Sequence, residues 1–544
     1  MSIFLALWTD PRLLIPWISE WSMQQQPLLD TQQSFGTFTS TTDQGLASMD
    51  PMIKDSKILR NSSTMVALAL VVVYSVAIMP LWLFVLVPIA LLSAAYRALF
   101  RAKADKQSRQ GVDSPLSPTK SERVYDLVLY GATGFTGTLA ARYLAKQYRG
   151  QPLKWAISGR SRSKLEDLRR DIGLDETSMP IIVADADDLA SIGAMVAQTK
   201  VVITTAGPFD VFGHTLVRAC AELGTHYCDI TGETDFVRRM IGAHDDTARR
   251  TGAKLVFHCG HDCIPWDLLV FELSGIMKKK GETLVDFSAY DELCAKASAG
   301  TINTAKNVIF GRKKKMPSSL DFDPLLKTSA GSKSTNKVIV DNVSSIRFSR
   351  ENRSWVGPFY MASVMANCVR RSNALLNYSS NLRYCEALVY PNVFAAVIDF
   401  YDTLLLGTYM FSDPFLNFML PSSGPSDSFM DKVNTFTHTL CSLITFMDKG
   451  FLKVTACGLG SSGSKAKAVI YFPTDVGYRD TARMLVESGL VLALQHDAVA
   501  RAGVQGGCHT PASALGAGGL LLQRLVSTGS SFYVVESAAA AEGI

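Results

Sequence analysis

Three glycines form the clearest chemical signature in this 544-residue sequence, within the string Gly131-Ala-Thr133-Gly134-Phe135-Thr136-Gly137. The string follows a strand-like apolar run and opens a helix-like stretch, which is the context in which such a triplet binds a dinucleotide. The glycines permit a tight turn and let a pyrophosphate approach bare backbone N–H groups at the positive end of the helix. We expect these residues to contact a nucleotide cofactor; the alternative is a glycine-rich turn without a ligand.

The residues after the next predicted strand indicate which cofactor this is. An NAD site places an Asp or Glu there for the ribose 2′-hydroxyl, but this chain has the run Ser158-Gly-Arg160-Ser161-Arg-Ser-Lys164. A guanidinium beside hydroxyl groups suits a 2′-phosphate through charge-assisted hydrogen bonds. We therefore predict NADP(H), with Arg160 and Ser161 as the clamp and Lys164 as a second charge. The alternative is a solvated basic helix start, although cations there oppose the helix dipole.

Two further loops are expected to contact the cofactor. Asp185 follows the third predicted strand and is expected near the adenine. Ala206, Gly207 and Pro208 follow the fourth and are expected along the nicotinamide side. Ordinary turns are the alternative for both loops.

The elements that must position these residues alternate between short β-rich runs and helical stretches, which is typical of a doubly wound parallel α/β sheet. The predicted strands are Tyr125–Tyr130, Trp155–Ser158, Pro180–Ala184, Val201–Thr205, His226–Asp229 and Lys254–His258, and the helices between them include Phe135–Tyr148, Ser161–Ile172, Asp187–Gln198 and Asp235–Arg250. Six strands in this length make one complete Rossmann domain that binds NAD(P). After Gly281 the pattern loosens, which favours a second, α+β domain.

No catalytic residue is defined by the sequence. Hydride transfer needs an acid or base near the reacting carbon, and the candidates by position are Tyr227, Asp229, His261 and Asp262, which follow predicted strands. For each of them, a hydrogen-bonded loop residue is the alternative. The run from His258 to Cys263 holds imidazole and thiol groups, but no second Cys/His cluster follows it, so we predict no metal site.

Several segments, in one order, resemble the saccharopine dehydrogenase-like oxidoreductases, a family that includes the bacterial trans-acting enoyl reductases of glycolipid synthesis. They comprise residues 125–137, 156–165, 204–233 and 258–268, followed by shorter matches at 298–301, 357–362, 383–386, 475–478 and 506–512. The resemblance covers about three quarters of the chain, from Arg123 to Val535. It implies a Rossmann fold, NADP(H) and a lipid or glycolipid-pathway substrate.

The chain departs from the family pattern at one point near the presumed active cleft. The family usually has Gly-Phe-Asp-Ser-Ile-Pro-Ser-Asp where this sequence has Gly-His261-Asp-Cys-Ile-Pro-Trp266-Asp. Two bulky side chains, His261 and Trp266, therefore stand where the pattern differs. We expect the departure to alter the shape of the substrate that is accepted.

A 28-residue run without charge, from Met65 to Leu92, supplies almost the whole positive mean hydropathy of +0.14. As a helix it would be about 42 Å long, more than the roughly 30 Å hydrocarbon core of a bilayer. A tilted or kinked single span and a re-entrant wedge both fit. More basic residues follow the run than precede it, which predicts a cytosolic main domain. The scattered cysteines agree, because they lack the spacing of a disulfide scaffold.

The predicted organisation is a loosely ordered head (1–63), a membrane segment (64–100), a linker (101–122), the NADP-binding Rossmann domain (123–280), an α+β substrate or dimerisation domain (281–478), and a C-terminal helix and tail packing back on the nucleotide domain (479–544). We expect a membrane-anchored NADP(H)-dependent oxidoreductase at the endoplasmic reticulum or a lipid droplet, with a lipid-like substrate. A homodimer is one assembly that would fit. The net charge of +5, without basic-aromatic interleaving, argues against nucleic acid. The alternatives are a catalytically silent nucleotide-binding scaffold and an amino-acid dehydrogenase of the saccharopine type.

Overall fold

The computed structural model describes residues 87–88, 123–294, 316, 323–350, 352–359, 361–397, 399–400 and 450–536. The predicted head and linker lie outside these ranges, as does the apolar run Met65–Leu92 apart from residues 87 and 88. Among the helices of the described ranges, none has the length and apolar character needed to span a bilayer.

The first sheet is parallel and has seven strands in the order β3-β2-β1-β4-β5-β6-β14. Its strands are β1 (Tyr125–Tyr130), β2 (Trp155–Gly159), β3 (Ile181–Val183), β4 (Thr199–Thr204), β5 (His226–Asp229), β6 (Lys254–Val256) and β14 (Gly507–His509). The six predicted strands and the parallel α/β sheet are confirmed. The seventh, β14, comes from the C-terminal part of the chain and pairs with β6.

Helices cover both faces of this sheet, because its central strands are apolar on both sides. They are α7 (Phe135–Gln147), α8 (Arg162–Ile172), α9 (Leu189–Ala197), α10 (Phe209–Leu223) and α11 (Thr234–Thr251). Leu127 and Leu129 of β1 belong to a core that includes α7 and α8 residues, whereas Val128 and Tyr130 belong to one with α9, α10 and α11 residues. The loops that follow the carboxyl ends of the strands are therefore anchored to a sheet that is packed on both faces.

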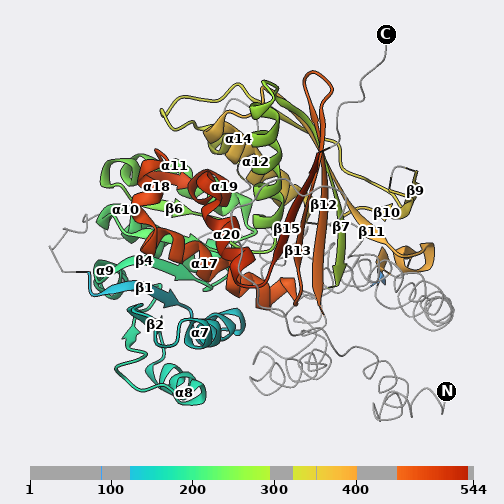
Figure 1. Cartoon of the computed structure of the whole chain (residues 1–544). Helices are drawn as coiled ribbons and strands as arrows, with labels where there is room; N and C mark the ends of the chain where they lie inside the picture. Colours follow the sequence, from blue (N-terminus) through green and yellow to red (C-terminus); the bar gives the residue numbers. More distant parts are fainter. Residues whose placement is uncertain are drawn as a thin grey trace, which may run out of the picture. The chain divides into compact units, whose positions relative to one another are not determined.

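The second sheet is mixed and follows the order β15-β13-β12-β7-β11-β10-β9, with β8 also paired to β11 (Figure 1). Its strands are β7 (Leu284–Cys294), β8 (Lys337–Val340), β9 (Arg347–Ser349), β10 (Ser354–Gly357), β11 (Asn381–Tyr390), β12 (Phe451–Gly460), β13 (Lys465–Phe472) and β15 (Ser531–Glu536). The helices α12 (Ile264–Lys279) and α14 (Ala362–Leu376) pack together, and α12 lies against β7, β12 and β13.

The C-terminal part of the chain contributes to both sheets. A π-helical turn, η7 (Val476–Asp480), leads into α17 (Thr481–Leu494), and α18 (His496–Arg501), α19 (Pro511–Leu515) and α20 (Leu520–Ser527) follow. The predicted C-terminal helix is α17, and every residue from Thr481 to Ala493 is buried. The reason is that α17 packs against α7 and β4 and also against α20. The tail is shared, since β14 joins the first sheet whereas β15 pairs with β13 of the second.

Candidate functional site

The glycine loop between β1 and α7 has a backbone that only glycine suits. Gly131 has a φ of +81°, and a Cβ there would lie 2.9 Å from the Ala206 backbone nitrogen. A Cβ on Gly137 would lie 2.2 Å from the Gly131 carbonyl oxygen, and the Thr205 hydroxyl donates to that same oxygen over 3.1 Å. The loop is therefore packed tightly against the turn after β4, so the cradle is fixed by its own backbone.

The first turn of α7 is open on its outer side. Thr133, Gly134 and Phe135 are exposed and Thr136 is half-buried, and no side chain caps the helix. The Phe135 ring packs edge-on against Tyr478 of η7, with 5.2 Å between centroids. Since the first backbone N–H groups of a helix have no partner within it, this end presents N–H donors and the positive end of the dipole to a phosphate. The residues present fit the pyrophosphate of a dinucleotide.

The residues after β2 present positive charge at the start of α8. Arg160 is exposed and forms no ion pair with any described residue, and Lys164 is also exposed. The Ser161 hydroxyl is the N-cap of α8 and accepts from the Lys164 backbone N–H over 3.5 Å. This turn has no acidic residue. A 2′-phosphate would therefore meet an unneutralised guanidinium and a helix N-terminus together, which fits NADP rather than NAD.

The two remaining predicted loops also lie at the carboxyl ends of strands. Asp185 is exposed after β3, and its carboxylate accepts from the Asp187 backbone N–H over 3.1 Å. Ala206, Gly207 and Pro208 connect β4 to α10, and Gly207 is exposed. These positions are where open α/β sheets bind ligands.

The predicted catalytic candidates Tyr227 and Asp229 face each other inside the protein. Both are fully buried, and the Tyr227 hydroxyl donates to Asp229 Oδ2 over 2.8 Å. The other oxygen, Oδ1, accepts from the backbone N–H groups of Thr231 and His258. Burial raises the pKa of Asp229 to about 6. Because every oxygen has a partner, this network holds the loops after β5 and β6 together.

His258 is part of the same network and has an unusual backbone. Its φ is +66°, and its Nδ1 lies 2.6 Å from the Thr231 carbonyl oxygen. Burial lowers the pKa of His258, but Cys263, Asp229 and the Thr231 carbonyl together outweigh burial and raise this pKa to about 9. Cys259 is directed elsewhere, as its thiol donates to the Val256 carbonyl oxygen over 3.6 Å. Of the residues considered for a metal, His258 and Cys263 therefore interact with each other, whereas the Cys259 thiol bonds to the backbone.

The other two candidates, His261 and Asp262, form a pair in the loop between β6 and α12. His261 Nδ1 lies 3.2 Å from Asp262 Oδ1. The His261 ring is packed against Trp266, with 5.5 Å between centroids, and its backbone N–H donates to the Thr481 hydroxyl over 3.1 Å. Asp262 is about one third exposed. This pair is more open to a ligand than Tyr227 and Asp229.

Three buried acidic residues near these loops were not predicted from the sequence. Glu233 accepts from the Phe209 and Asp210 backbone N–H groups over 2.7 and 3.0 Å, and so caps α10 from the neighbouring loop. Asp291 of β7 accepts from Trp266 Nε1 over 3.1 Å, and Glu386 of β11 accepts from a tyrosine hydroxyl. Burial raises the pKa of both Asp291 and Glu386. An acidic residue within an apolar strand was the available signal for both.

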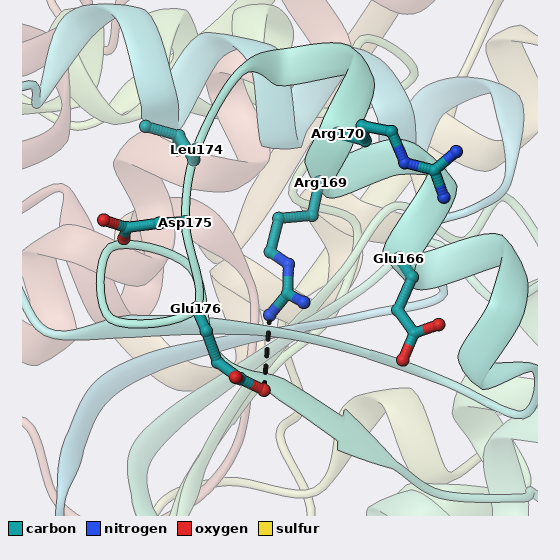
Figure 2. Close-up of a pocket in the computed structure, with 6 residues that line it drawn as sticks. All are labelled: Glu166, Arg169, Arg170, Leu174, Asp175 and Glu176. Atoms are coloured by element: carbon teal, nitrogen blue, oxygen red, sulfur yellow. Dashed lines mark ion pairs between the residues drawn. The ribbon is translucent and has the colours of Figure 1, made fainter.

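A surface pocket of about 360 Å³ lies between α8 and the turn that follows it (Figure 2). Its lining is mostly charged and comprises Glu166, Arg169, Arg170, Leu174, Asp175 and Glu176. Arg169 and Glu176 form an ion pair at 3.6 Å. The pocket is separate from the glycine loop, because it is formed by the C-terminal half of α8 and the turn after it.

Comparison with known proteins agrees with this geometry. Residues 127–256 match the saccharopine dehydrogenase NADP binding domain. A trans-acting enoyl reductase of Mycobacterium leprae is 31% identical over 430 residues, which cover 76% of this chain and 98% of that protein. A Mycobacterium tuberculosis homologue of these reductases is 32% identical over 423 residues, with coverages of 76% and 98%.

Among solved structures, the apo saccharopine dehydrogenase (L-Glu forming) of Saccharomyces cerevisiae has a TM-score of 0.42 at 12% identity, with 76% of this chain and 99% of that chain covered. The predicted family and cofactor are confirmed by the sequence matches. The chain belongs to the saccharopine dehydrogenase-like family of NADP-binding oxidoreductases, together with the trans-acting enoyl reductases.

Proposed function

We propose that this oxidoreductase uses NADPH to reduce a carbon–carbon double bond conjugated to a carbonyl group in a lipid-like substrate, while attached to a membrane. The observation that carries the redox part is the N-terminus of α7 beside the exposed Arg160, which forms no ion pair with any described residue. Its relatives over three quarters of the chain are named as enoyl reductases, which supports this reaction class. The uncharged run Met65–Leu92 supports the membrane and the lipid-like substrate.

The residues of the chain have defined tasks in such a reaction. The glycine loop binds the pyrophosphate through backbone N–H groups, and Arg160 holds the 2′-phosphate. When bound, NADPH supplies a hydride. The buried Tyr227–Asp229 pair keeps the loops after β5 and β6 in register, so that the substrate is held in a rigid cleft.

A catalytically silent scaffold is the second candidate. The observation that favours it is the closed hydrogen-bond network of Tyr227 and Asp229, which leaves neither group available to a substrate. Such a protein would bind NADPH without transferring a hydride. The saccharopine-type amino-acid dehydrogenase is less favoured, because a water-soluble substrate gains nothing from a membrane segment.

Binding and activity assays of the full-length chain in detergent micelles distinguish the two candidate functions. We expect tight NADPH binding, followed by NADPH oxidation when trans-2-dodecenoyl-N-acetylcysteamine or a fractionated lipid extract is added. Tight binding without oxidation in any fraction would favour the scaffold. Carbonate extraction of cell membranes tests attachment, since an embedded chain stays in the pellet.

The remaining expectations concern location and assembly. We propose a cytosolic main domain at the endoplasmic reticulum or a lipid droplet, and a homodimer as the assembly. Fluorescent tagging with protease protection checks the first. Light scattering of the purified chain checks the second.

A further inference from the structure

Two acidic side chains of the second sheet are buried beside each other. Asp291 of β7 and Glu386 of β11 are both 0% exposed. The two strands run parallel, with Leu388 as the register partner of Asp291, and Glu386 stands two residues before Leu388. Alternate residues of a strand point to the same face of its sheet, so both carboxyl groups point toward α12, whose Trp266 donates to Asp291. Each carboxyl group therefore needs its partners inside the protein.

Two of the four carboxylate oxygens accept from donors elsewhere in the described part of the chain. Asp291 Oδ1 accepts from Trp266 Nε1 over 3.1 Å, and Glu386 Oε2 accepts from the Tyr384 hydroxyl over 2.6 Å. Asp291 Oδ2 and Glu386 Oε1 are buried and have no such donor among the described residues. Because buried polar groups are nearly always hydrogen-bonded, these two oxygens call for an explanation.

One proton between the two carboxyl groups satisfies both remaining oxygens. A protonated carboxyl group has one O–H donor, so Glu386 Oε1–H can donate to Asp291 Oδ2, and the two side chains are in hydrogen-bond contact. Burial raises the pKa of both groups, and the Asp291 charge raises that of Glu386 further, whereas hydrogen bonds from Trp266 and Glu386 oppose the rise for Asp291. Two adjacent buried negative charges are strongly unfavourable, so the pair keeps one proton.

The titratable groups around the pair favour this protonated state. Asp262 and Cys263, in the loop before α12, both raise the pKa of Glu386. Burial and the Glu386 charge raise the pKa of Tyr384 well above its usual value, so the Tyr384 hydroxyl remains a donor. The basic ring of His258 interacts with Cys263.

The pair attaches the start of α12 to the second sheet. Trp266 lies in the first turn of this helix, is fully buried and donates to Asp291. Its ring also packs against His261 and Phe359, with 5.5 and 6.1 Å between centroids. In the sheet, Asp291 has the apolar Val454 of β12 as its register partner. The protonation of the pair therefore bears on the loop between β6 and α12, which carries His261.

We propose that Asp291 and Glu386 share one proton at neutral pH and that this proton fastens the start of α12 to the second sheet, so that the attachment weakens as pH rises. When α12 separates from the sheet, both carboxyl groups meet water, their pKa values return to about 4, and the proton is released. The contribution of the proton to stability is therefore full below about pH 4 and falls as pH rises toward the folded value. The device does not depend on the reaction that the protein catalyses.

Hydrogen–deuterium exchange of the α12 peptides, measured by mass spectrometry of the full-length chain, reports how often this attachment opens. Glu386→Gln is the decisive variant, because its amide can donate to Asp291 Oδ2 at every pH and makes the proton unnecessary. The ratio of wild-type to variant exchange rates should rise about tenfold per pH unit between about pH 6 and about pH 8. Intrinsic exchange rates cancel in this ratio, because α12 has the same sequence in both proteins.

Two further variants complete the design. Asp291→Asn is the reciprocal change, since its amide can accept from Trp266 and donate to Glu386, and it should give the same rise. Glu292→Gln is the matched control, because it removes a partly exposed carboxylate from the next residue of β7, where Glu292 pairs with Lys453. Its α12 exchange should follow that of the wild type at every pH.

Infrared spectroscopy detects the shared proton directly. At about pH 8, the difference spectrum between the wild type and Glu386→Gln should contain the carbonyl band of one protonated carboxyl group. Either a ratio of exchange rates that stays constant from about pH 6 to about pH 8, or the absence of this band, would overturn the inference.

Discussion

Polar groups around the glycine loop face solvent, whereas those in the loops after β5 and β6 are hydrogen-bonded inside the protein. Around the glycine loop, the start of α7 is uncapped and Arg160 has no ion-pair partner among the described residues. Around Asp229, every carboxylate oxygen is bonded inside the protein. Position at a strand end is therefore insufficient to identify a ligand-binding residue, because its polar group must also be free to form a hydrogen bond with the ligand.

The largest effect on NADPH affinity is expected for Gly137→Ala in the glycine loop. The added Cβ would lie 2.2 Å from the Gly131 carbonyl oxygen, so the loop must shift and close the cradle. We expect NADPH affinity to fall by more than about 100-fold, measured by quenching of protein fluorescence. Gly275→Ala is the matched control, because that exposed helical position has nothing within 4 Å. Unchanged NADPH binding in Gly137→Ala would remove the glycine loop from the site.

Arg160→Ala tests the specificity for NADPH over NADH. Loss of a charge-assisted hydrogen bond should weaken NADPH binding by about tenfold to a hundredfold and leave NADH binding unchanged. Arg170→Ala removes another exposed arginine, from the last turn of α8, and should change neither affinity. Equal losses for NADPH and NADH would contradict the 2′-phosphate assignment.

Away from both regions, at the amino end of β5, pH should act on stability rather than on cofactor binding. Burial, reinforced by Lys254, lowers the pKa of His226 to about 3. A histidine with a depressed folded pKa contributes stability that is present above its unfolded pKa of 6.5 and lost as pH falls toward the folded value. Between about pH 7 and about pH 5, the wild type should lose roughly 2 kcal/mol more unfolding free energy than His226→Gln.

The variant is needed because other groups titrate in the opposite sense. Burial raises the pKa of Asp229 and Asp267 to about 6, so these two acids destabilise the fold less as pH falls through that value. Urea unfolding of both proteins at the two pH values isolates the histidine. Parallel pH dependence of wild type and variant would show that His226 does not titrate in this way.

The smallest effect is expected for Tyr227→Phe. It leaves Asp229 Oδ2 without its donor, which should cost about 1–2 kcal/mol of unfolding free energy, measured by urea unfolding. The NADPH dissociation constant should stay the same and kcat should change little. A collapse of kcat without loss of stability would mean that Tyr227 is catalytic and that the contrast between the two regions is wrong.

The first sheet was predictable from sequence because its information is local. Apolar runs of strand length alternate with helical stretches, and the glycine spacing marks the first turn, so β1 and β5 begin and end where predicted. The positions of Arg160 and Ser161 after β2 followed from the same register. These features depend on neighbouring residues and on the backbone, which a single sequence records.

The rest depended on contacts between distant segments. Helix α17 is buried on all sides because α7 and α20 lie against it. The local hydrophobic pattern does not indicate packing partners that are far apart in the sequence. Tyr227 and Thr231 bond to Asp229 from nearby in the sequence, but its third donor is the backbone N–H of His258, 29 residues away. The Trp266 ring that packs against His261 is fixed by Asp291 of the second sheet, which accepts from the indole N–H. This arrangement could not be inferred from the sequence of the loop alone.

The central claim is that this chain transfers a hydride from NADPH to a conjugated lipid-like substrate. It is tested most directly by incubating the full-length chain with trans-2-dodecenoyl-N-acetylcysteamine and NADPH deuterated on the transferred position, followed by mass spectrometry of the thioester. We predict a saturated product carrying one deuterium at the β-carbon. NADPH bound tightly with no deuterium in any product would contradict the account.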